Sequence, residues 1–430
     1  MKLTRKTGRL AAVIGTVAAA ALVLSGCGST GPSASGGASA WALTGQQKTI
    51  QSAFDSWNQS NADQSINVQF FQNDAFKQKI RTAIGSGNSP TLIWSWGGAG
   101  NFKTYVDSKK VIPLDESLTK NFFPSIVNNG KIDGTLYAIP NNTVQPVVLY
   151  FNKDLFKKAG IDTPPATWDE LLHDVSTLKA NGIAPFAMGG ASKWPQLMWL
   201  EYLLDRIGGP KVFEAIQQNK KDAWSDPAIA QSIDKIQELI KAGGFIDGYH
   251  SVSTDSNADT ALLTTGKAAM IVQGAWAYAN MKNSDPEFVK SSLGWSPFPT
   301  VGGGAGDPKN VVGNASNYWS ISSDASQTEQ TAAKQFLAKG NMTDAYVDNL
   351  IAGGGVPPVL GIESKIKASP NGDFLMDVYT MSKDAPSFTL SWDQAISPAA
   401  ADAMLTNLDK VFLGQMNAQQ FADAMNKTIQ

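Results

Sequence analysis

Two hydrophobic periods alternate along the chain from Trp41 onward, and this alternation limits the fold more than any other feature of the sequence. Apolar residues share one helical face at 50–57, every second residue is apolar at 66–70, and a helical stripe returns at 76–84. A short apolar strand follows at 91–95, so the order of strand, helix and strand repeats. This rhythm is typical of an α/β fold with a largely parallel sheet.

Helical signals dominate the second half of the chain. Thr167 and Glu170 have the spacing of a capping box at the start of a helix. A stripe of isoleucines at 229–240 predicts another helix, and the segment from Ser397 to the end is expected to form two helices. The glycine-rich run 302–306 lacks the ending of a phosphate loop, so we interpret it as a flexible loop.

The first residues predict a targeting signal that is separate from the fold. Four basic residues and no acidic one lie at 2–9, and the apolar run that follows is too short for a comfortable membrane span. The run ends in LSGC, which resembles a bacterial lipobox. We therefore expect residues 1–26 to be a lipoprotein signal peptide, and residues 27–40 to be the lipidated Cys27 and a flexible Gly/Ser tether. These features predict a protein anchored to the outer face of the cytoplasmic membrane.

Charge and residue counts exclude several classes of function. The chain has 35 Lys and Arg against 37 Asp and Glu, and without residues 1–26 the balance is 31 − 37 = −6. A chain without a basic field is a poor candidate for binding nucleic acid. One cysteine and two histidines, His173 and His250, leave no disulfide framework and no multi-cysteine zinc or iron–sulfur site. We expect no metal and no cofactor.

The sequence contains no recognisable catalytic motif. Neither histidine belongs to a Ser/His/Asp order or an HExxH pair, and there is no Gly-x-Ser-x-Gly elbow. Two carboxylates could still form a glycosidase, because that reaction needs only an acid and a base or nucleophile placed across the glycosidic bond. A surface-anchored glycoside hydrolase is therefore an open alternative.

Three polar loops follow the early strands, where open α/β sheets bind their ligands. The segments are 44–46 (TGQ), 72–74 (QND) and 94–98 (WSWGG), and they combine neutral or weakly charged hydrogen-bonding groups with aromatic rings. This mixture suits a carbohydrate, since the C–H face of a sugar lies flat on an indole while its hydroxyls need donors and acceptors. The candidate ligand contacts from these loops are Gln46, Asn73, Asp74, Trp94 and Trp96.

Ten of the twelve tryptophans can be assigned to the core or to the candidate site. Because strand side chains alternate, we expect only one of Trp94 and Trp96 to face the ligand. The tryptophans interpreted as core residues are Trp57, Trp168, Trp199 and Trp224. Further site candidates lie in loops or at the ends of apolar segments beside polar residues; they are Trp194, Trp276, Trp319, Trp392 and Asp393. Asn142 and Asn317 are added from their position alone.

Four segments carry a family resemblance. They are LYFNKDLFKKAGI with PPATWDEL at 149–171, AAM at 268–270, GAW at 274–276 and GGGVP at 353–357. With these motifs the chain, from about Trp41 to its C-terminus, resembles the extracellular solute-binding lipoproteins of sugar ABC importers, the family that includes maltose-binding protein. The resemblance implies a two-lobed periplasmic-binding-protein-like (type II) α/β fold with a ligand cleft between the lobes.

The same resemblance implies the lobe boundaries and several roles. The N-terminal lobe would comprise 41–146 plus 298–341, and the C-terminal lobe 147–297 plus 342–430. Trp276 would be a stacking tryptophan, Trp94 or Trp96 the one after the early strand, and Trp392 one near the C-terminal helices. We expect a monomeric receptor and not an enzyme, with an oligosaccharide ligand and the transmembrane subunits of an ABC permease as partners.

Within the family, FFQNDAF at 70–76 and WSWGG at 94–98 are most similar to actinobacterial binders of xylobiose and xylo-oligosaccharides. Xylobiose is therefore the expected ligand, with cello- and chito-oligosaccharides as rivals. A receptor for a charged solute, such as an amino acid or polyamine, would need a paired carboxylate or an arginine clamp. The candidate loops are aromatic and mostly neutral, so they favour a sugar.

Overall fold

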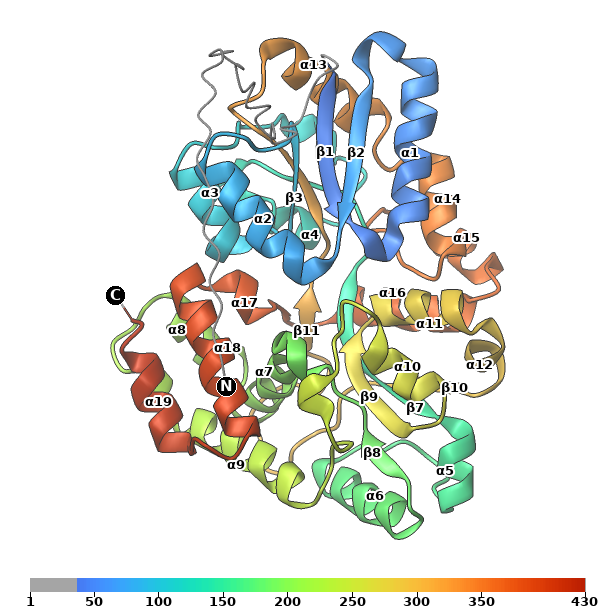
Figure 1. The fold of residues 1–430 in the computed structure, drawn as a ribbon, viewed down its shortest axis with the longest axis vertical. Helices are drawn as coiled ribbons and strands as arrows, with labels where there is room; N and C mark the ends of the chain where they lie inside the picture. The colour runs from blue at the N-terminus through green and yellow to red at the C-terminus, as the bar shows by residue number, and fades with distance from the viewer. Residues whose placement is uncertain (1–36, 430) are drawn as a thin grey trace, which may run out of the picture.

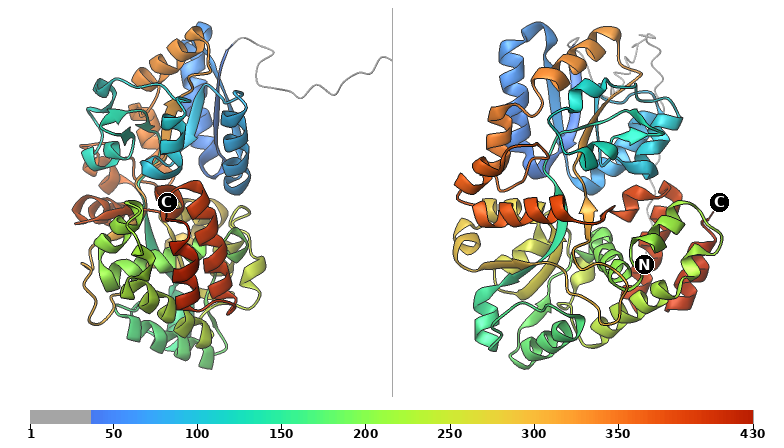
Figure 2. Two further views of the ribbon diagram at one scale, coloured as in Figure 1. Left: turned by 90° about the vertical axis from the view of Figure 1, so that its left-hand side faces the viewer. Right: turned by 180° about the vertical axis from the view of Figure 1, so that it is seen from behind.

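The computed structural model describes residues 37–429, so the predicted signal peptide, Cys27 and most of the predicted tether lie outside the described residues. The structure has two lobes, each built on a sheet with helices on its faces (Figure 1). Views from the side and from behind show the same division, with helix α16 (Gly372–Asp384) lying across the boundary (Figure 2). The expected two-lobed α/β fold is confirmed.

The sheet of the first lobe has the strand order β2-β1-β3-β12-β6. Its strands are β1 (Ala38–Leu43), β2 (Ile66–Phe71), β3 (Leu92–Ser95), β6 (Ile139–Pro140) and β12 (Tyr318–Ile321). β2, β1 and β3 are parallel, whereas β12 and β6 are antiparallel to their neighbours. Since Ala38 and Ala40 are buried in β1, the predicted tether extends too far, and residues 38–40 belong to the sheet.

Helices cover the faces of this first sheet. They are α1 (Gln47–Ser60), α2 (Asn73–Gly85), α3 (Lys103–Asp107), α4 (Pro124–Asn128), α13 (Gln327–Lys339), α14 (Asp344–Ala352) and α15 (Glu363–Ala368), with a small hairpin of β4 (Lys131–Ile132) and β5 (Thr135–Leu136). The predicted apolar face of α1 is buried through Ile50, Phe54 and Trp57. Burial of this stripe holds the helix on the sheet.

The second sheet has the order β13-β11-β7-β9-β8, and β10 also pairs with β7. The strands are β7 (Gln145–Asn152), β8 (Ala184–Phe186), β9 (Ala268–Gly274), β10 (Leu293–Ser296), β11 (Val311–Asn314) and β13 (Phe388–Leu390). β7 runs antiparallel to β9, β10 and β11. The prediction of a largely parallel sheet is therefore wrong for this lobe, because β7 enters from the first lobe and β11 leads back to it.

Helices contribute many more residues to the second lobe than its strands do. They are α5 (Lys153–Ala159), α6 (Trp168–Ala180), α7 (Trp194–Gly208), α8 (Pro210–Gln217), α9 (Pro227–Lys241), α10 (Ala258–Thr264), α11 (Trp276–Ser284), α12 (Pro286–Ser291), α17 (Trp392–Ala395), α18 (Pro398–Phe412) and α19 (Ala418–Asn426). Both hydrogen bonds of the capping box predicted at Thr167 and Glu170 are present. Within residues 37–429, no helix has the length and apolar character needed to cross a membrane.

The chain passes between the lobes three times within the described residues. It crosses between β6 and β7, between β11 and β12, and between α15 and α16. The first two crossings are extended segments that connect one sheet directly to the other. Side chains on these segments therefore lie between the lobes, at the base of any cleft.

Two segments lie in a different lobe from the one expected. Residues 298–310 pack on the second lobe, where the ring of Phe298 stacks on Tyr202 and the amide of Ala305 donates to the carbonyl of Ile207. The glycine-rich run is therefore a loop held against α7. Residues 342–362 pack on the first lobe, where the hydroxyl of Tyr346 donates to the carbonyl of Asn141 and Val359 pairs with Phe122. Helix α15 also packs on the first lobe, through Lys365 and the carboxylates of Asp344 and Asp348. The expected boundaries at 298 and 342 are therefore corrected to about 315 and 369.

Candidate functional site

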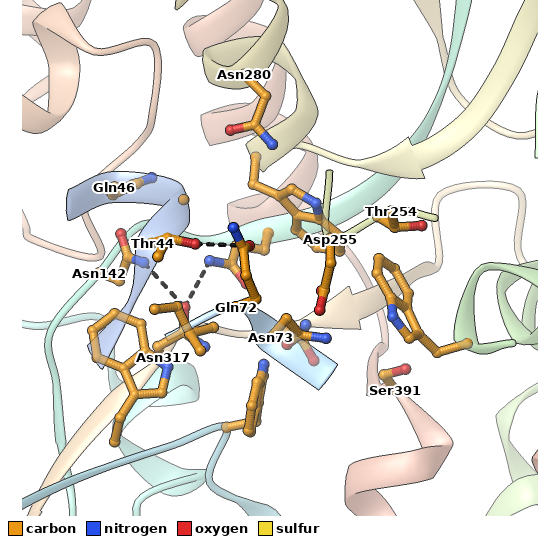
Figure 3. Close-up of a pocket in the computed structure, with 18 of the residues that line it drawn as sticks. Thr44, Gln46, Gln72, Asn73, Asn142, Thr254, Asp255, Asn280, Asn317 and Ser391 are labelled. Carbon is orange, nitrogen blue, oxygen red and sulfur yellow. Dashed lines mark hydrogen bonds between the residues drawn. The ribbon is translucent and has the colours of Figure 1, made fainter. Parts of the chain in front are cut away.

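A cavity of about 500 Å³ lies between the two lobes (Figure 3). The first lobe lines it with the loops that follow β1, β2 and β3, including the short helical segment η1 (Thr44–Gln46). These loops lie together because the three strands are parallel, so their carboxyl ends meet at one edge of the sheet. All three loops named from the sequence therefore contribute to one cavity.

The second lobe lines the cavity with α11, the start of α7 and the loop before α10. Trp276, Asn280 and Asn283 lie on one face of α11, because positions i, i+4 and i+7 share a face. The ring centroids of Trp276 and Trp194 are 5.9 Å apart, with the ring planes tilted by 54°. The two indoles together form an aromatic wall on this side of the cavity.

The crossing segments line the base of the cavity with amides. Asn142 Nδ2 and Gln145 Nε2 both donate to Asn317 Oδ1, at 3.1 and 2.8 Å (Figure 3). Two donors on its carbonyl oxygen fix the orientation of the Asn317 amide, so its NH₂ group is free to donate. The residue is 2% exposed, and this NH₂ group has no hydrogen-bond partner among the described residues.

Five buried polar atoms of the cavity lining lack a hydrogen-bond partner within residues 37–429. The donors are Trp94 Nε1, Trp194 Nε1 and Asn317 Nδ2, and the acceptors are Gln46 Oε1 and Asn314 Oδ1. Leaving such groups unpaired away from water costs about 1–3 kcal/mol each. All five are uncharged, so the cavity is suited to a neutral ligand that both donates and accepts hydrogen bonds.

Glycine at 274 permits the position of the Trp276 indole. A Cβ atom built on Gly274 would overlap the six-membered ring of Trp276. Gly274 is the last residue of the buried strand β9, and α11 begins two residues later. The GAW segment thus combines a strand end, a close approach of the backbone and an aromatic wall.

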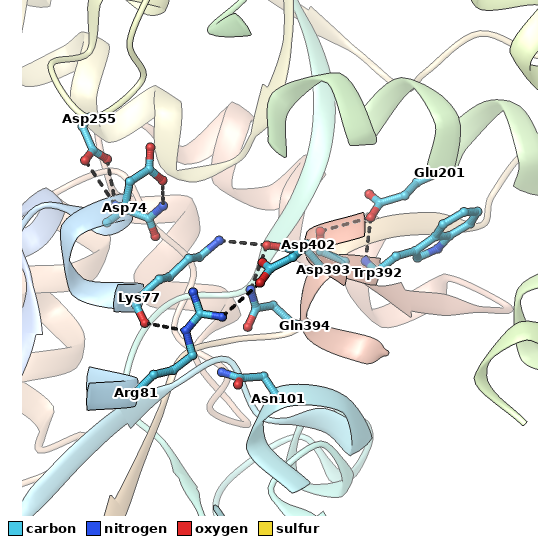
Figure 4. A network of polar contacts seen from close by, with 12 residues as sticks. Asp74, Lys77, Arg81, Asn101, Glu201, Asp255, Trp392, Asp393, Gln394 and Asp402 are labelled. Carbon is cyan, nitrogen blue, oxygen red and sulfur yellow. Dashed lines mark hydrogen bonds and ion pairs between the residues drawn. The ribbon is translucent and has the colours of Figure 1, made fainter. Parts of the chain in front are cut away.

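Two charged contacts join the lobes along α2. Lys77 Nζ lies 2.8 Å from Asp393 Oδ2, and the amide of Asp74 donates to both carboxylate oxygens of Asp255 at 3.2 and 3.3 Å (Figure 4). Asp255 therefore caps the first turn of α2 from the other lobe. Burial raises the pKa of Asp255, and the neighbouring Asp74 carboxyl raises it further. Burial alone would raise the pKa of Asp393, but Lys77, together with hydrogen bonds from Gln394 and Ser391, outweighs burial and holds this pKa below its ordinary value.

The segment that carries Asp393 is held from inside the second lobe. Glu201 Oε1, on α7, accepts from the amide of Trp392 at 2.7 Å and from the hydroxyl of Ser391 at 3.1 Å. Glu201 is 1% exposed, so this connection is made in the core. It fixes the start of α17 and thereby the position of Asp393 at the cavity.

Nine of the twelve ligand contacts predicted from the sequence line the cavity. They are Gln46, Asn73, Trp94, Trp96, Asn142, Trp194, Trp276, Asn317 and Asp393. Both Trp94 and Trp96 line it, so the expectation that only one would do so is wrong. Strand side chains alternate with a period of two, which places residues i and i+2 on the same face. The four tryptophans interpreted as structural are all buried.

Three predicted contacts lie elsewhere. Asp74 is in the first turn of α2, where its backbone is bonded to Asp255 outside the cavity lining. Trp319 is 1% exposed and packs edge-on against Trp94 and Phe54. Trp392, also 1% exposed, stacks on Phe213 with 4.2 Å between the ring centroids. Both tryptophans are core residues, so a direct contact with a ligand in the cavity is incorrect for them.

Several lining residues were not predicted from the sequence. They are Lys77, Met198, Thr254, Asp255, Asn257, Asn280, Asn283 and Asn314, among others. Helical spacing from Asn73 and Trp276 could have indicated Lys77, Asn280 and Asn283. No group of three or more His, Cys, Asp or Glu side chains within residues 37–429 is arranged to hold a metal ion.

Comparisons with known proteins show what the chain is similar to. The family model described as bacterial extracellular solute-binding protein matches residues 40–339. An uncharacterized ABC transporter extracellular-binding protein of Pyrococcus horikoshii is 29% identical over 198 residues, which are 45% of this chain and 42% of that protein. The chain thus matches less than half of that relative's length. The sn-glycerol-3-phosphate-binding periplasmic protein of Escherichia coli K12 is 27% identical over 317 residues, 68% of this chain and 67% of that protein.

Solved structures share the whole fold. A structure from work on xylan utilization by the thermophilic bacterium Caldanaerobius polysaccharolyticus is 27% identical, with a TM-score of 0.82, and the match covers 92% of this chain and 100% of that one. Further structures of binding proteins show the same fold at 16–22% identity and TM-scores of 0.67–0.81.

Proposed function

The chain belongs to the family of bacterial extracellular solute-binding proteins, and on this basis we propose that its cavity captures a neutral oligosaccharide. It is the solute-binding component of an ABC importer and not an enzyme, so the glycoside hydrolase alternative is set aside. The five uncharged, unpaired polar atoms beside the indoles carry the proposal of a sugar ligand. Three donors and two acceptors suit hydroxyl groups, each of which donates and accepts.

The charges of the cavity argue against an anionic solute such as glycerol phosphate. Its ionisable lining residues are Lys77, Asp255 and Asp393, a formal excess of one negative charge. The only lysine among them is already paired with Asp393, and the lining contains no arginine. Phosphate binding usually relies on free cationic groups, and bidentate arginine is the strongest of these. The cavity therefore favours a neutral ligand.

We propose xylobiose or a xylo-oligosaccharide as the ligand. The segments 70–76 and 94–98 support this proposal through their resemblance to xylobiose binders, and both contribute to the cavity. The structure from the xylan-utilization work, at 27% identity over the whole fold, also supports it. Cello- and chito-oligosaccharides are the alternatives.

Delivery to the permease would occur at the membrane surface. We propose that Cys27 carries the lipid and that residues 28–37 tether the body to the outer face of the membrane. Two or more acyl chains give stable anchoring. Detergent phase partition tests the anchor. We expect the wild-type protein to enter the detergent phase and Cys27→Ala to stay in the aqueous phase.

Isothermal titration of the purified protein tests the proposed function. Xylobiose, cellobiose, chitobiose, maltose and glycerol 3-phosphate are titrated, and the recovered sugar is checked for cleavage. We expect one-to-one binding of xylobiose, returned intact. Binding of glycerol 3-phosphate in preference to every sugar would overturn the proposed ligand class, and tighter binding of another sugar would replace xylobiose.

Gly274→Ala is expected to weaken sugar binding by about tenfold or more while the protein stays folded. The three atoms nearest to the added methyl group all belong to the six-membered ring of Trp276, so we expect the indole, rather than the backbone, to move. A loss of aromatic contact of this kind corresponds to at least about 1.4 kcal/mol. Titration measures the affinity, and a thermal melt checks the fold.

The matched control for this substitution is Gly302→Ala, because a Cβ atom there meets nothing within 4 Å. It is expected to bind the sugar as the wild-type protein does. Unchanged affinity in Gly274→Ala would mean that Trp276 does not depend on this glycine.

Lys77→Met is expected to lower sugar affinity by about tenfold. It leaves Asp393, whose side chain is 8% exposed, without its cation in the closed arrangement of the lobes. Breaking a partly buried pair is estimated to cost about 1–2 kcal/mol, between the values for exposed and buried pairs. A double-mutant cycle with Asp393→Asn measures the coupling. Full additivity of the two substitutions would show that the pair does not stabilise the bound state.

A further inference from the structure

We infer that the cavity accepts only one terminus of an oligosaccharide, because it is closed at the end formed by α2 and α17 and open at the end formed by η1 and α11. This inference rests on the proposed sugar-binding function and adds the direction in which a chain can be longer. Two features of the structure carry it: interlobe contacts along α2, and the exposure of the lining residues at the opposite end.

The closed end is made by contacts from a single face of α2. Positions 74, 77 and 81 share this face, and each contacts a different aspartate of the second lobe (Figure 4). Their partners are Asp255, Asp393 and Asp402, and the outermost pair, Arg81 and Asp402, is 3.6 Å apart. These contacts join the lobes along two turns of the helix.

Backbone packing seals the same end behind the ion pair. Gln394 Nε2 donates to Asp393 Oδ2 at 2.8 Å, so both lining residues are tied to the Lys77 contact. A Cβ atom on Gly100 would overlap the carbonyl oxygens of Gln394 and Ile396. Since the segment η3 (Gly98–Phe102) lies directly on α17, no passage is left between them for a sugar ring.

The opposite end of the cavity is open to solvent. Its lining residues Gly45, Asn283 and Ser284 are exposed. No hydrogen bond or ion pair within the described chain joins residues 44–51 to residues 276–284. Helix α11 is joined to the first lobe further along, where Lys282 Nζ donates to the carbonyl of Ala352 at 2.6 Å. Since η1 makes no such contact with α11, a chain could pass between η1 and α11.

This asymmetry determines how chain length affects affinity. A group added to the buried terminus must displace the Lys77 and Asp393 contact, whereas a group added to the other terminus emerges into solvent. Lys77 and Asp393 are thus specificity-determining residues for the terminus of the sugar.

Derivatives of the disaccharide that binds in the titration panel, xylobiose in our expectation, test the inference. One derivative carries an aryl group at the reducing end, and the other carries a benzyl ether at the non-reducing end. We expect one of them to bind within about threefold of the parent and the other to bind at least 100-fold more weakly. Xylotriose is expected to bind within about threefold of xylobiose.

Similar affinities for the two derivatives, whether both strong or both weak, would overturn the inference while leaving the sugar-binding function intact. Absence of binding by every sugar would instead overturn the function. Lys77→Ala should improve binding of the disfavoured derivative, relative to the parent sugar, by at least about tenfold. Lys79→Ala, on the same helix but outside the cavity lining, is the control and should leave the ratio unchanged. If Lys77→Ala left the ratio of the two affinities, disfavoured derivative to parent sugar, unchanged, Lys77 would not close this end of the cavity.

Discussion

Replacement of Trp276 by alanine is expected to weaken oligosaccharide binding by about 100-fold. The indole lines the cavity beside Trp194, and it is held by the close approach of Gly274. A sugar ring that stacks on it removes on the order of 100 Å² of apolar surface from water, which at about 25 cal/mol per Å² is about 2.5 kcal/mol. Each 1.4 kcal/mol corresponds to about a tenfold change in affinity, so a loss of one to two orders of magnitude follows.

Trp295→Ala is the matched control for this prediction. Trp295 is also partly buried in the second lobe, but its indole donates to Asp377 at 2.9 Å outside the cavity. Its removal is expected to lower the melting temperature and leave the affinity unchanged. Trp276→Phe should retain most of the binding, because a smaller ring still offers a flat apolar face. If Trp276→Ala and Trp295→Ala reduced affinity equally, the indole would have no specific role in binding.

The strand-end loops of the site were predictable because they depend on local pattern and on one general property of parallel sheets. Apolar segments at 66–71 and 91–95 identified the strands, and the polar residues after them fell at the ends that meet. Gln46, Asn73 and Trp96 were found in this way. No knowledge of distant contacts was needed for them.

Trp319 and Trp392 were assigned incorrectly because their neighbours are distant in sequence. The position of Trp319 depends on α1, whose Phe54 packs against its ring. Trp392 and Asp393 are adjacent, yet Trp392 enters the core of the second lobe while Asp393 faces the cavity. In a short helix, packing decides which side chains face the core. The four residues of α17 are too few to show a hydrophobic period from which this could be predicted.

The predicted lobe boundaries at 298 and 342 were wrong for a similar reason. Residues 298–310 have no regular period, and their place beside α7 depends on glycines that allow backbone contact with Arg206. The contact between Lys77 and Asp393 spans 316 positions, so no local motif could indicate it. Interlobe contacts of this kind are visible only when both lobes are assembled.

Glu201→Gln is expected to remove a pH-dependent loss of stability. Burial raises the pKa of Glu201 from its ordinary 4.5 to about 8, and the nearby Asp393 carboxylate adds to this, while hydrogen bonds from Trp392 and Ser391 act in the opposite direction. The folded protein therefore keeps a proton that the unfolded chain releases above pH 4.5. Stability falls as the pH rises through this window, by about 1.4 kcal/mol per pH unit.

Over the interval from 4.5 to about 8 this loss amounts to at most about 4–5 kcal/mol in the free energy of unfolding. A glutamine does not titrate, and its oxygen can still accept hydrogen bonds from Trp392 and Ser391. The free energy of unfolding of Glu201→Gln, relative to that of the wild-type protein, should therefore increase steadily between pH 5 and 8. Denaturant unfolding at several pH values measures the difference. Glu214→Gln, on the exposed side of α8, is the control and should follow the wild-type curve. Parallel pH profiles for Glu201→Gln and the wild-type protein would show that Glu201 is ionised in the folded state, and that the start of α17 is held by a charged acceptor.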